Sequence, residues 1–193
     1  MAWAVQQIPQ IMRTSAIVGV ILVGITLVAT TPTRALDLSH TIWGVVGQER
    51  KIDPNLLLAV ALVESKRYAG PGKISPHPWA IRDAAGPHFC KSLQEAKNLL
   101  TNPRANTDVG LMQVNLYWNG NRVKDPSDLL DPGTNIRVGA DVLVEAIRSA
   151  PNDIILGIGR YHRPDDEIEA RAYGTRVYST WQNLTRLPGK GSA

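Results

Sequence analysis

The stretch "LLLAVALVES", residues 56–65, decides the fold of this chain. Eight apolar residues follow one another without a break before Glu64 and Ser65. A surface helix would include polar residues in such a run, and a membrane span needs about 20 apolar residues. We therefore predict a helix buried in a small domain, with Glu64 where that helix meets a cleft. Asp53 and Pro54 favour the helix start, as an N-cap and a first-turn residue.

The first 35 residues have the pattern of a secretory signal peptide. Arg13 comes before an apolar stretch at residues 16–29, and a short segment of small and polar residues ends at Ala35. The apolar stretch is shorter than the ~20 residues of a membrane span, so we predict cleavage after Ala35 rather than a retained anchor. The mature chain is then periplasmic and meets a membrane only during export.

Composition and charge limit the partners of the chain. With 193 residues, 44% of them hydrophobic, the chain suits one globular domain plus the N-terminal segment. Arg13 and Arg34 supply two of its four net positive charges and leave with that segment, so a nucleic-acid partner is not expected. Cys90 is the only cysteine, which excludes an internal disulfide. His77, His88 and Cys90 match no zinc spacing, so we expect neither metal nor cofactor.

Apolar spacing and capping residues predict a mostly helical domain of α+β type over residues 36–184. Ser39 is the expected cap of a first helix that runs past Val46. Residues 78–90 predict two short extended segments about a turn at residues 83–86. Ser92 and Glu95 then form the capping-box pattern of another helix. This is a helical domain with a small β-hairpin excursion.

The second half of the domain returns to helical spacing after a segment rich in Gly and Asn. Residues 106–121 predict a turn and a short extended segment, and Asn152 is the expected cap of a short apolar helix. A final helix carries Tyr173, Val177 and Trp181 on one face, and residues 185–193 form a flexible tail. The helix between these segments has an apolar stripe at helical spacing made of Ile136, Ala140, Leu143, Val144 and Ile147.

Glu64 is a candidate general acid. Apolar neighbours disfavour an ionised carboxyl, and the C-terminal end of a helix is its negative pole, so both raise the pKa. A carboxyl that stays protonated near neutral pH can give its proton to a leaving group. Taken alone, Glu64 is better explained as a glutamate that emerges into solvent where the helix ends, because glutamate is usually exposed.

Further motifs follow Glu64 in a fixed order. They are "ES" at residues 64–65, "GLMQVN" at 110–115, "LLDPGTNIRVGADVL" at 129–143 and "GRYH" at 159–162. In this order the chain resembles the lytic transglycosylases of the goose-lysozyme-like superfamily, over residues 42–184. The insert at residues 75–100 and the Tyr161–His162 pair are most similar to members that accompany conjugation or type IV secretion machines.

The resemblance implies a lysozyme-like fold with a glycan-binding cleft, and cleavage of peptidoglycan glycan strands. Glu64 would be the sole acid/base, protonating the oxygen between N-acetylmuramic acid and N-acetylglucosamine. It would then accept the proton of the muramic C6 hydroxyl as a 1,6-anhydro ring closes. Asp108 is the best candidate for a second carboxylate, although capping a turn is its more ordinary role.

The resemblance also implies the substrate-binding residues. Ser65 would orient Glu64 or the sugar, and Tyr161 would reach the catalytic carboxyl. Gly110 would admit a close approach of the substrate, while Met112 either lines the groove or fills the core. His162 stands where many members carry Asn, and Pro164 replaces a common glycine. The full expected set is Ser65, Gly110, Met112, Gln113, Asn115, Tyr161 and His162.

Other functions stay open at this stage. A lysozyme-type hydrolase and a non-catalytic wall-binding scaffold of a secretion complex are the alternatives, and components of such a complex are possible partners. A Ser65–His162 nucleophile pair lacks the Gly-x-Ser-x-Gly elbow. Tyr117 and Trp118 are either sugar platforms or packing residues, and Trp79 with its insert is placed to touch peptide stems or a partner.

Overall fold

A helix, α2 (Pro54–Ser65), lies at the centre of the fold, as the sequence predicts. The computed structural model describes residues 36–104 and 106–186. Asp53 accepts the N–H of Asn55 and Pro54 occupies the first turn, so the expected start of the helix is confirmed. Leu57 and Val60 are wholly buried, and each such side chain stabilises the fold by roughly 1.5–3 kcal/mol.

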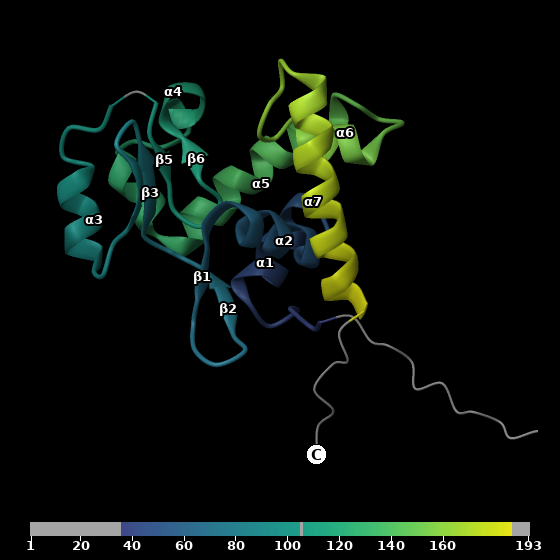
Figure 1. Ribbon diagram of the computed structural model, residues 1–193, viewed down its shortest axis with the longest axis horizontal. Coiled ribbons are helices and arrows are strands. Elements are labelled where there is room, and N and C mark those ends of the chain that lie inside the picture. Colours follow the sequence, from purple (N-terminus) through teal and green to yellow (C-terminus); the bar gives the residue numbers. More distant parts are fainter. Residues whose placement is uncertain (1–35, 105, 187–193) are drawn as a thin grey trace, which may run out of the picture. The chain divides into compact units, whose positions relative to one another are not determined.

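The helices surround α2 on several sides. α7 crosses in front of α2 in Figure 1 and packs against both α2 and α6, while α5 packs against α1 and α6. Within the described ranges, no helix is long and apolar enough to cross a bilayer. The helices are α1 (Ile42–Arg50), α2, α3 (Leu93–Leu99), α4 (Leu116–Asn119), α5 (Pro132–Arg148), α6 (Ile154–Gly159) and α7 (Glu167–Arg186).

Two small antiparallel sheets complete the fold. One contains only β1 and β2, and the other has the order β4-β3-β5-β6. The predicted mostly helical α+β class is therefore confirmed. The strands are β1 (Lys66–Tyr68), β2 (Ile74–Pro76), β3 (Ala80–Asp83), β4 (Gly86–Phe89), β5 (Asp108–Val109) and β6 (Val114–Asn115). Short 3-10 helices, η1 (Gly120–Arg122) and η2 (Pro126–Leu130), lead into α5.

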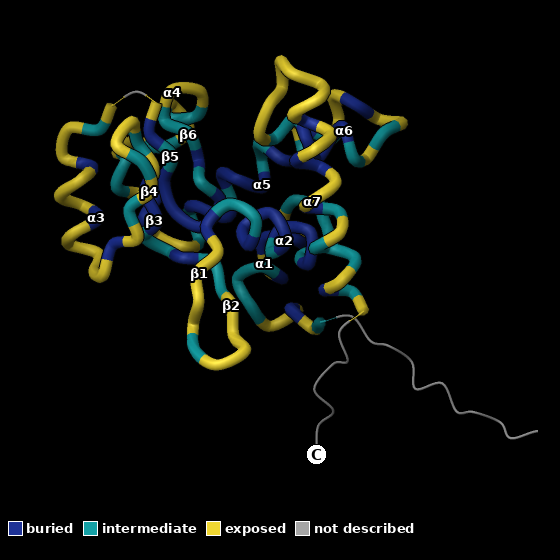
Figure 2. The backbone as a smooth tube through the Cα atoms, in the orientation of Figure 1, coloured by how far each residue is buried: buried dark blue, intermediate teal, exposed yellow. Residues whose placement is uncertain are grey.

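Burial follows this arrangement. Figure 2 shows the buried backbone concentrated in α2 and along α5, whereas α3 and the β1–β2 hairpin are largely exposed. On α5, Ile136, Ala140 and Leu143 of the predicted stripe are buried. On α7, Tyr173 and Val177 are buried and Trp181 packs against the same core. The helix pattern read from apolar spacing is thus confirmed for both elements.

The hairpin predicted within residues 78–90 is present as β3 and β4, but a second hairpin was not predicted. β3 and β4 pair about the expected turn, where Gly86 adopts a φ of 115°. No strand was predicted directly after α2, yet Lys66–Tyr68 pairs there with Ile74–Pro76. All of β1 is exposed, so this strand has no apolar alternation to reveal it.

Two capping predictions need correction. Thr41, not Ser39, caps α1, and Ser39 bonds to Asp37 instead. Asp153, not Asn152, caps α6 by accepting the N–H of Leu156. In each case the residue directly before the helix has the extended backbone that a cap requires, and an aspartate also complements the helix dipole.

The capping box of α3 forms only in part. Ser92 accepts the N–H of Glu95, as expected, but the carboxylate of Glu95 accepts the N–H of Lys91 rather than that of Ser92. The short helix α4 was also missed, since Gly and Asn surround it. Asn115 caps α4 through the N–H groups of Tyr117 and Trp118.

The predicted terminal segments lie largely outside the described residues. The signal peptide at residues 1–35 falls outside them entirely. Of the tail expected from residue 185, the structure describes Thr185 and Arg186, and both belong to α7. Residues 187–193 are not described.

Candidate active site

Glu64 lies in the last turn of α2, where the buried helix passes into β1. Its side chain is only 13% exposed. The hydroxyl of Tyr173, on α7, donates a hydrogen bond of 2.6 Å to Oε1 of Glu64. The expected setting of this glutamate, a carboxyl at the end of an apolar helix, is therefore what the structure contains.

The surroundings raise the pKa of Glu64 to about 7. Burial is the largest cause, and the negative charge of Asp108 adds to it. The hydrogen bond from Tyr173 acts in the opposite direction, as do the positive charges of Arg82 and Arg176. The carboxyl is thus balanced between a proton donor and a carboxylate at neutral pH, which is what a group serving as acid and then base requires.

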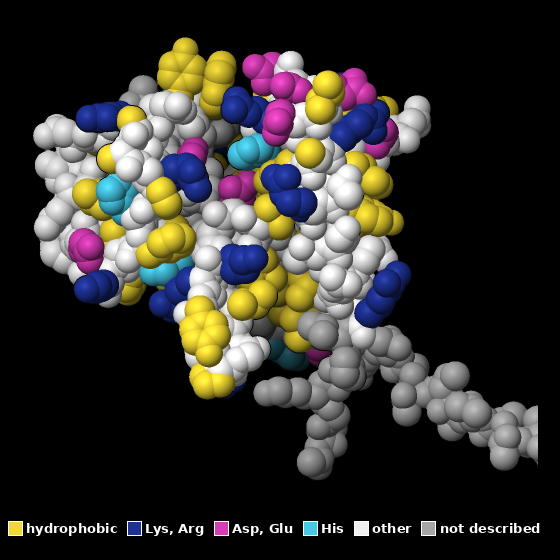
Figure 3. Space-filling view, in the orientation of Figure 1, with side chains coloured by type: hydrophobic (Ala, Val, Ile, Leu, Met, Phe, Trp, Pro, Cys, Tyr) yellow, Lys and Arg dark blue, Asp and Glu magenta, His cyan; other side chains and the backbone are white. Residues whose placement is uncertain are grey.

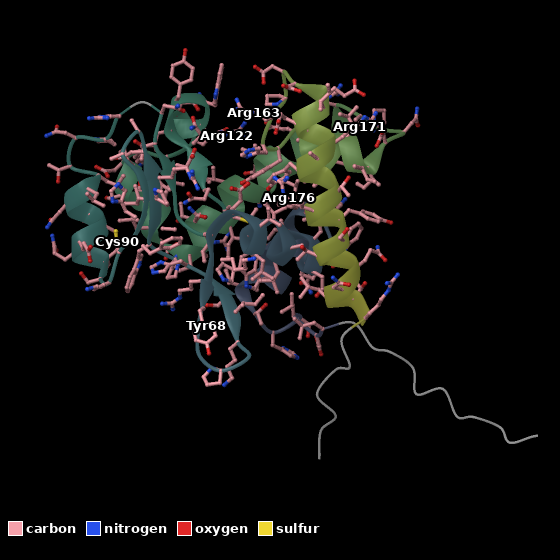
Figure 4. All side chains as sticks on the ribbon, in the orientation of Figure 1. Tyr68, Cys90, Arg122, Arg163, Arg171 and Arg176 are labelled. Atoms are coloured by element: carbon pink, nitrogen blue, oxygen red, sulfur yellow. The ribbon has the colours of Figure 1, made fainter. Side chains whose placement is uncertain are left out.

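Charged side chains gather around this carboxyl. Figure 3 shows a hollow on this face of the protein, between the part that carries α4 and β3–β6 and the part formed by α6 and α7. Basic, acidic and histidine side chains lie along this hollow. Figure 4 labels Arg163 after α6 and Arg176 on α7 on one side of it. A pocket of about 490 Å³ elsewhere is lined by Leu36, Gly47, Pro54 and their neighbours, and none of these charged groups lines it.

Tyr161 does not reach Glu64, contrary to expectation. Its hydroxyl donates to the carbonyl of Met112 at 2.6 Å, and burial raises the pKa of this hydroxyl well above 10. Tyr173 makes the predicted contact instead. The sequence placed Tyr173 only on the core face of α7. The available signal was that a buried tyrosine hydroxyl needs a partner, and Glu64 ends the helix that α7 covers.

His162 covers the carboxyl from the solvent side. Its ring stacks on that of Tyr173, with centroids 4.7 Å apart and planes at 8°. Nδ1 lies 3.8 Å from Oε1 of Glu64, an ion pair only if the ring is protonated. Burial, with Arg163 and Arg176, lowers the pKa of His162, so the neutral ring is favoured at pH 7. His162 therefore offers a polar, uncharged group beside the acid.

The loop at residues 110–113 is held by Asn135 of α5. Asn135 is 1% exposed, accepts the N–H of Met112 at 2.8 Å, and donates to the carbonyls of Val109 and Leu129 at 2.8 and 2.9 Å. Asn135 was not among the site residues predicted from the sequence. An asparagine in the first turn of a helix is normally exposed, and only its position against the loop reveals this function.

Gly110 and Met112 serve the protein interior rather than the substrate. Gly110 has a φ of +80°, and a Cβ there would collide with the side chain of Asn135. Its close approach is therefore to Asn135 rather than to a sugar. Met112 is wholly buried and packs against Gly139, so it fills the core. The prediction that Met112 lines the groove is wrong, because its side chain does not reach the surface.

Ser65 has a positioning role. It is 1% exposed, donates to the carbonyl of Leu111 at 2.7 Å, and accepts the N–H of His77 at 3.3 Å. Of the two roles expected for Ser65, the structure favours orienting Glu64 over touching the sugar. Ser65 ties the end of α2 to the loop that follows β5.

Gln113 and Asn115 are half-buried. Nε2 of Gln113 donates to the carbonyls of Ala80 and Gly110, and the residue adopts a φ of 47°. Its amide oxygen makes no hydrogen bond within the described residues. Asn115 uses its amide to bond Asp108 at 2.8 Å and to cap α4. The amide oxygen of Gln113 is therefore available as an acceptor, whereas the side-chain amide of Asn115 already bonds other protein groups.

Tyr117 and Trp118 are the exposed aromatic residues of α4. They are 63% and 74% exposed and meet edge to face with centroids 4.6 Å apart. Neither fills the core, so of the two roles expected for them the structure favours a surface platform. Aromatic faces at the edge of a hollow suit the apolar faces of pyranose rings.

Asp108 lies in β5 and acts on Glu64 through charge. It accepts a hydrogen bond from Asn115, and burial raises its pKa. We expect Asp108→Asn to keep most of the activity and to move the alkaline limb of the pH–rate profile to lower pH, since a negative charge that raises the pKa of Glu64 is removed. Rates on purified cell-wall sacculi across pH 5–9 test this. A loss beyond about a hundredfold would instead assign Asp108 a direct chemical step.

Tyr173→Phe should move the alkaline limb of the pH–rate profile to higher pH, opposite to the effect of Asp108→Asn. The lost hydrogen bond favours the ionised carboxylate, so its removal raises the pKa of Glu64 and extends activity to higher pH. A rate decrease of about tenfold or less accompanies the change, because one hydrogen bond contributes about 1 kcal/mol. Tyr161→Phe is the matched control, since its hydroxyl bonds Met112. An identical profile for both variants would contradict the assignment.

Fold and site together define a lysozyme-like protein built around one buried carboxyl of raised pKa. The chain matches the family described as Transglycosylase SLT domain over residues 41–173, from the cap of α1 to Tyr173. It belongs to that family. No curated protein and no solved structure matches it. Membership supports the activity of a peptidoglycan lytic transglycosylase and the binding of peptidoglycan as substrate.

Proposed function

We propose that this protein cleaves the bond between N-acetylmuramic acid and N-acetylglucosamine with Glu64 as its only acid/base. The observation that carries the proposal is the buried Glu64 carboxyl, with its pKa of about 7 and its hydrogen bond from Tyr173. A neutral carboxyl donates its proton to the glycosidic oxygen as the bond to C1 breaks. The resulting carboxylate accepts the proton of the muramic C6 hydroxyl as O6 bonds C1.

The ring closure needs no water, so the saccharide product ends in 1,6-anhydro-N-acetylmuramic acid. Burial supports this route, because a site that excludes water favours an internal hydroxyl over hydrolysis. His162, neutral and beside the carboxyl, would hydrogen-bond a sugar hydroxyl without taking the proton from Glu64. The amide oxygen of Gln113 would accept from the sugar, and Tyr117 with Trp118 would stack on a ring farther along the strand.

Product mass distinguishes this proposal from its alternatives. Purified sacculi are digested, the released muropeptides are separated, and their masses are compared without prior reduction. The anhydro product is lighter by one water than the product of hydrolysis and has no reducing end. Reducing muropeptides would favour a lysozyme-type hydrolase. Binding of sacculi without any release would favour the wall-binding scaffold.

The export and cellular role proposed here rest on the sequence. The N-terminal segment carries Arg13, an apolar stretch and Ala35, so we place the mature domain in the periplasm, where peptidoglycan lies. The insert at residues 75–100, folded as β3, β4 and α3, is most similar to that of members that accompany conjugation or type IV secretion machines. We therefore propose that this protein works with such an apparatus. Local opening of the wall would be the contribution of this protein to such a machine.

A further inference from the structure

A pocket that the proposed chemistry does not use lies between the β1–β2 hairpin and the β3–β4 hairpin. Its volume is about 380 Å³. Figure 4 labels Tyr68 on the first hairpin and Cys90 at the end of the second. The side chains that line it include two cations, two aromatic groups and an imidazole, and the main ones are Arg67, His77, Trp79, Phe89, Cys90 and Lys91.

His77 presents a hydrogen-bond donor to this pocket. It is 5% exposed, and its Nδ1 accepts the N–H of Trp79 at 3.1 Å. Burial, and then the charge of Arg67, lower the pKa of His77, so the ring is neutral and carries its proton on Nε2. Within the described residues Nε2 makes no hydrogen bond. A buried imidazole therefore has one unpartnered donor, and it lines a pocket.

The rim of the pocket is positively charged and its walls are apolar. The side chains of Arg67 and Lys91 make no hydrogen bond or ion pair with any residue in the described ranges. The nearby carboxylate of Glu95 is turned to the backbone N–H of Lys91, at 2.7 Å. Phe89 is half exposed and its ring lies 5.5 Å from that of His77. An anion with an apolar portion is complementary to this arrangement.

The pocket is joined directly to the Glu64 site. The N–H of His77 donates to the carbonyl of Ser65 at 2.9 Å and lies 3.3 Å from its hydroxyl. Ser65 follows Glu64, and Arg67 is three residues from it. A substrate held at Glu64 therefore has this pocket within reach of a short substituent.

We propose that the pocket binds a free carboxylate of the peptide stem of peptidoglycan, so that the protein selects peptide-bearing muramic acid. The inference rests on the proposed function, since the stem is attached to the sugar whose bond Glu64 would break. The carboxylate lies between Arg67 and Lys91 and accepts the Nε2 proton of His77. Side chains of the stem pack on Trp79 and Phe89.

The test compares glycan strands that keep their stems with the same strands after an amidase has removed them. We expect the kcat/KM of the wild type to be about tenfold higher on the stem-bearing strands than on the stripped strands, because two partly exposed charged contacts contribute a factor of this size. The double variant Arg67→Gln, Lys91→Gln should lose that preference and keep the wild-type rate on stripped strands. Lys73→Gln, at the tip of the β1–β2 hairpin, is the matched control and should behave as the wild type.

Each other result overturns the inference. A wild type without preference, or a double variant that slows equally on both strands, removes the pocket from substrate selection. Binding of a soluble stem tripeptide is the second readout. Amidation of its carboxylates should weaken binding about tenfold. Equal binding of an unrelated peptide that ends in a carboxylate would exclude the stem as the specific ligand. Failure of the proposed function itself would appear differently, as the absence of anhydro products from both strands.

Discussion

Glu64→Gln is expected to lower the rate of glycan cleavage by about a thousandfold or more, the upper part of the range that general acid–base catalysis contributes. One carboxyl is proposed to perform both proton transfers, so its loss removes both. The glutamine amide retains the shape of the side chain and accepts the hydroxyl of Tyr173 as the carboxyl does. Release of muropeptides from sacculi at pH 6 is the measurement. Activity within tenfold of the wild type would remove Glu64 from the mechanism.

Two controls separate lost chemistry from lost folding. Glu145→Gln removes an exposed carboxylate that pairs with Arg122, and it should leave cleavage unchanged. The stability of Glu64→Gln gives the second control. Because the folded-state pKa of Glu64, about 7, exceeds its ordinary value of 4.5, the folded protein binds this proton more tightly than the unfolded chain does.

The linkage fixes the sign of the stability change. The contribution of Glu64 to the free energy of unfolding is largest below pH 4.5, and it decreases by roughly 3 kcal/mol as the pH rises to 7. The Glu64→Gln variant has no ionisable group at this position, so its free energy of unfolding does not decrease in this way. Its stability should match the wild type near pH 4 and exceed it at pH 8, as measured by urea unfolding. A less stable variant at pH 8 would mean that the ionised carboxylate is well accommodated.

Asn135→Ala is expected to lower the free energy of unfolding by roughly 3–5 kcal/mol, because a buried polar group left without a partner costs about 1–3 kcal/mol. The change removes the side-chain partner of the Met112 N–H and of the carbonyls of Val109 and Leu129. The loop that carries Gln113 would also lose its anchor, so cleavage should decrease at temperatures where the variant is still folded.

Asn152→Ala is the matched control for that experiment. Asn152 is exposed and does not cap α6, so its loss should change the free energy of unfolding by no more than about 0.5 kcal/mol. Urea unfolding of both variants under one condition gives the comparison. If Asn135→Ala cost less than about 1 kcal/mol, water would be replacing the side chain and the anchoring role would fail.

Much of this fold could be predicted because its central feature is local. A run of apolar residues that follows Asp53 and Pro54 determines α2, and the position of Glu64 at its end follows from the sequence alone. The stripe on α5 and the face of α7 are equally local patterns. The strand β1 could not be predicted, since its residues are all exposed and it pairs through the turn that follows it.

The site was harder to predict because its contacts join distant parts of the chain. Tyr173 is buried and Tyr161 is partly buried, and only the packing of α7 on α2 decides which of them reaches Glu64. Met112 lies in the expected motif, yet its side chain points into the core. Asn135 bonds a loop more than twenty residues earlier in the sequence. Motif order located the site, whereas three-dimensional packing assigned its individual contacts.

The pKa of the Glu64 carboxyl can be measured by titration. Protein labelled with ¹³C at the glutamate carboxyl is followed by NMR from pH 3 to pH 9, and the resonance that is missing in Glu64→Gln identifies the group. We expect a midpoint near pH 7 for this carboxyl. A midpoint near the ordinary value of 4.5 would contradict it, because the residue would then hold no proton to donate at neutral pH.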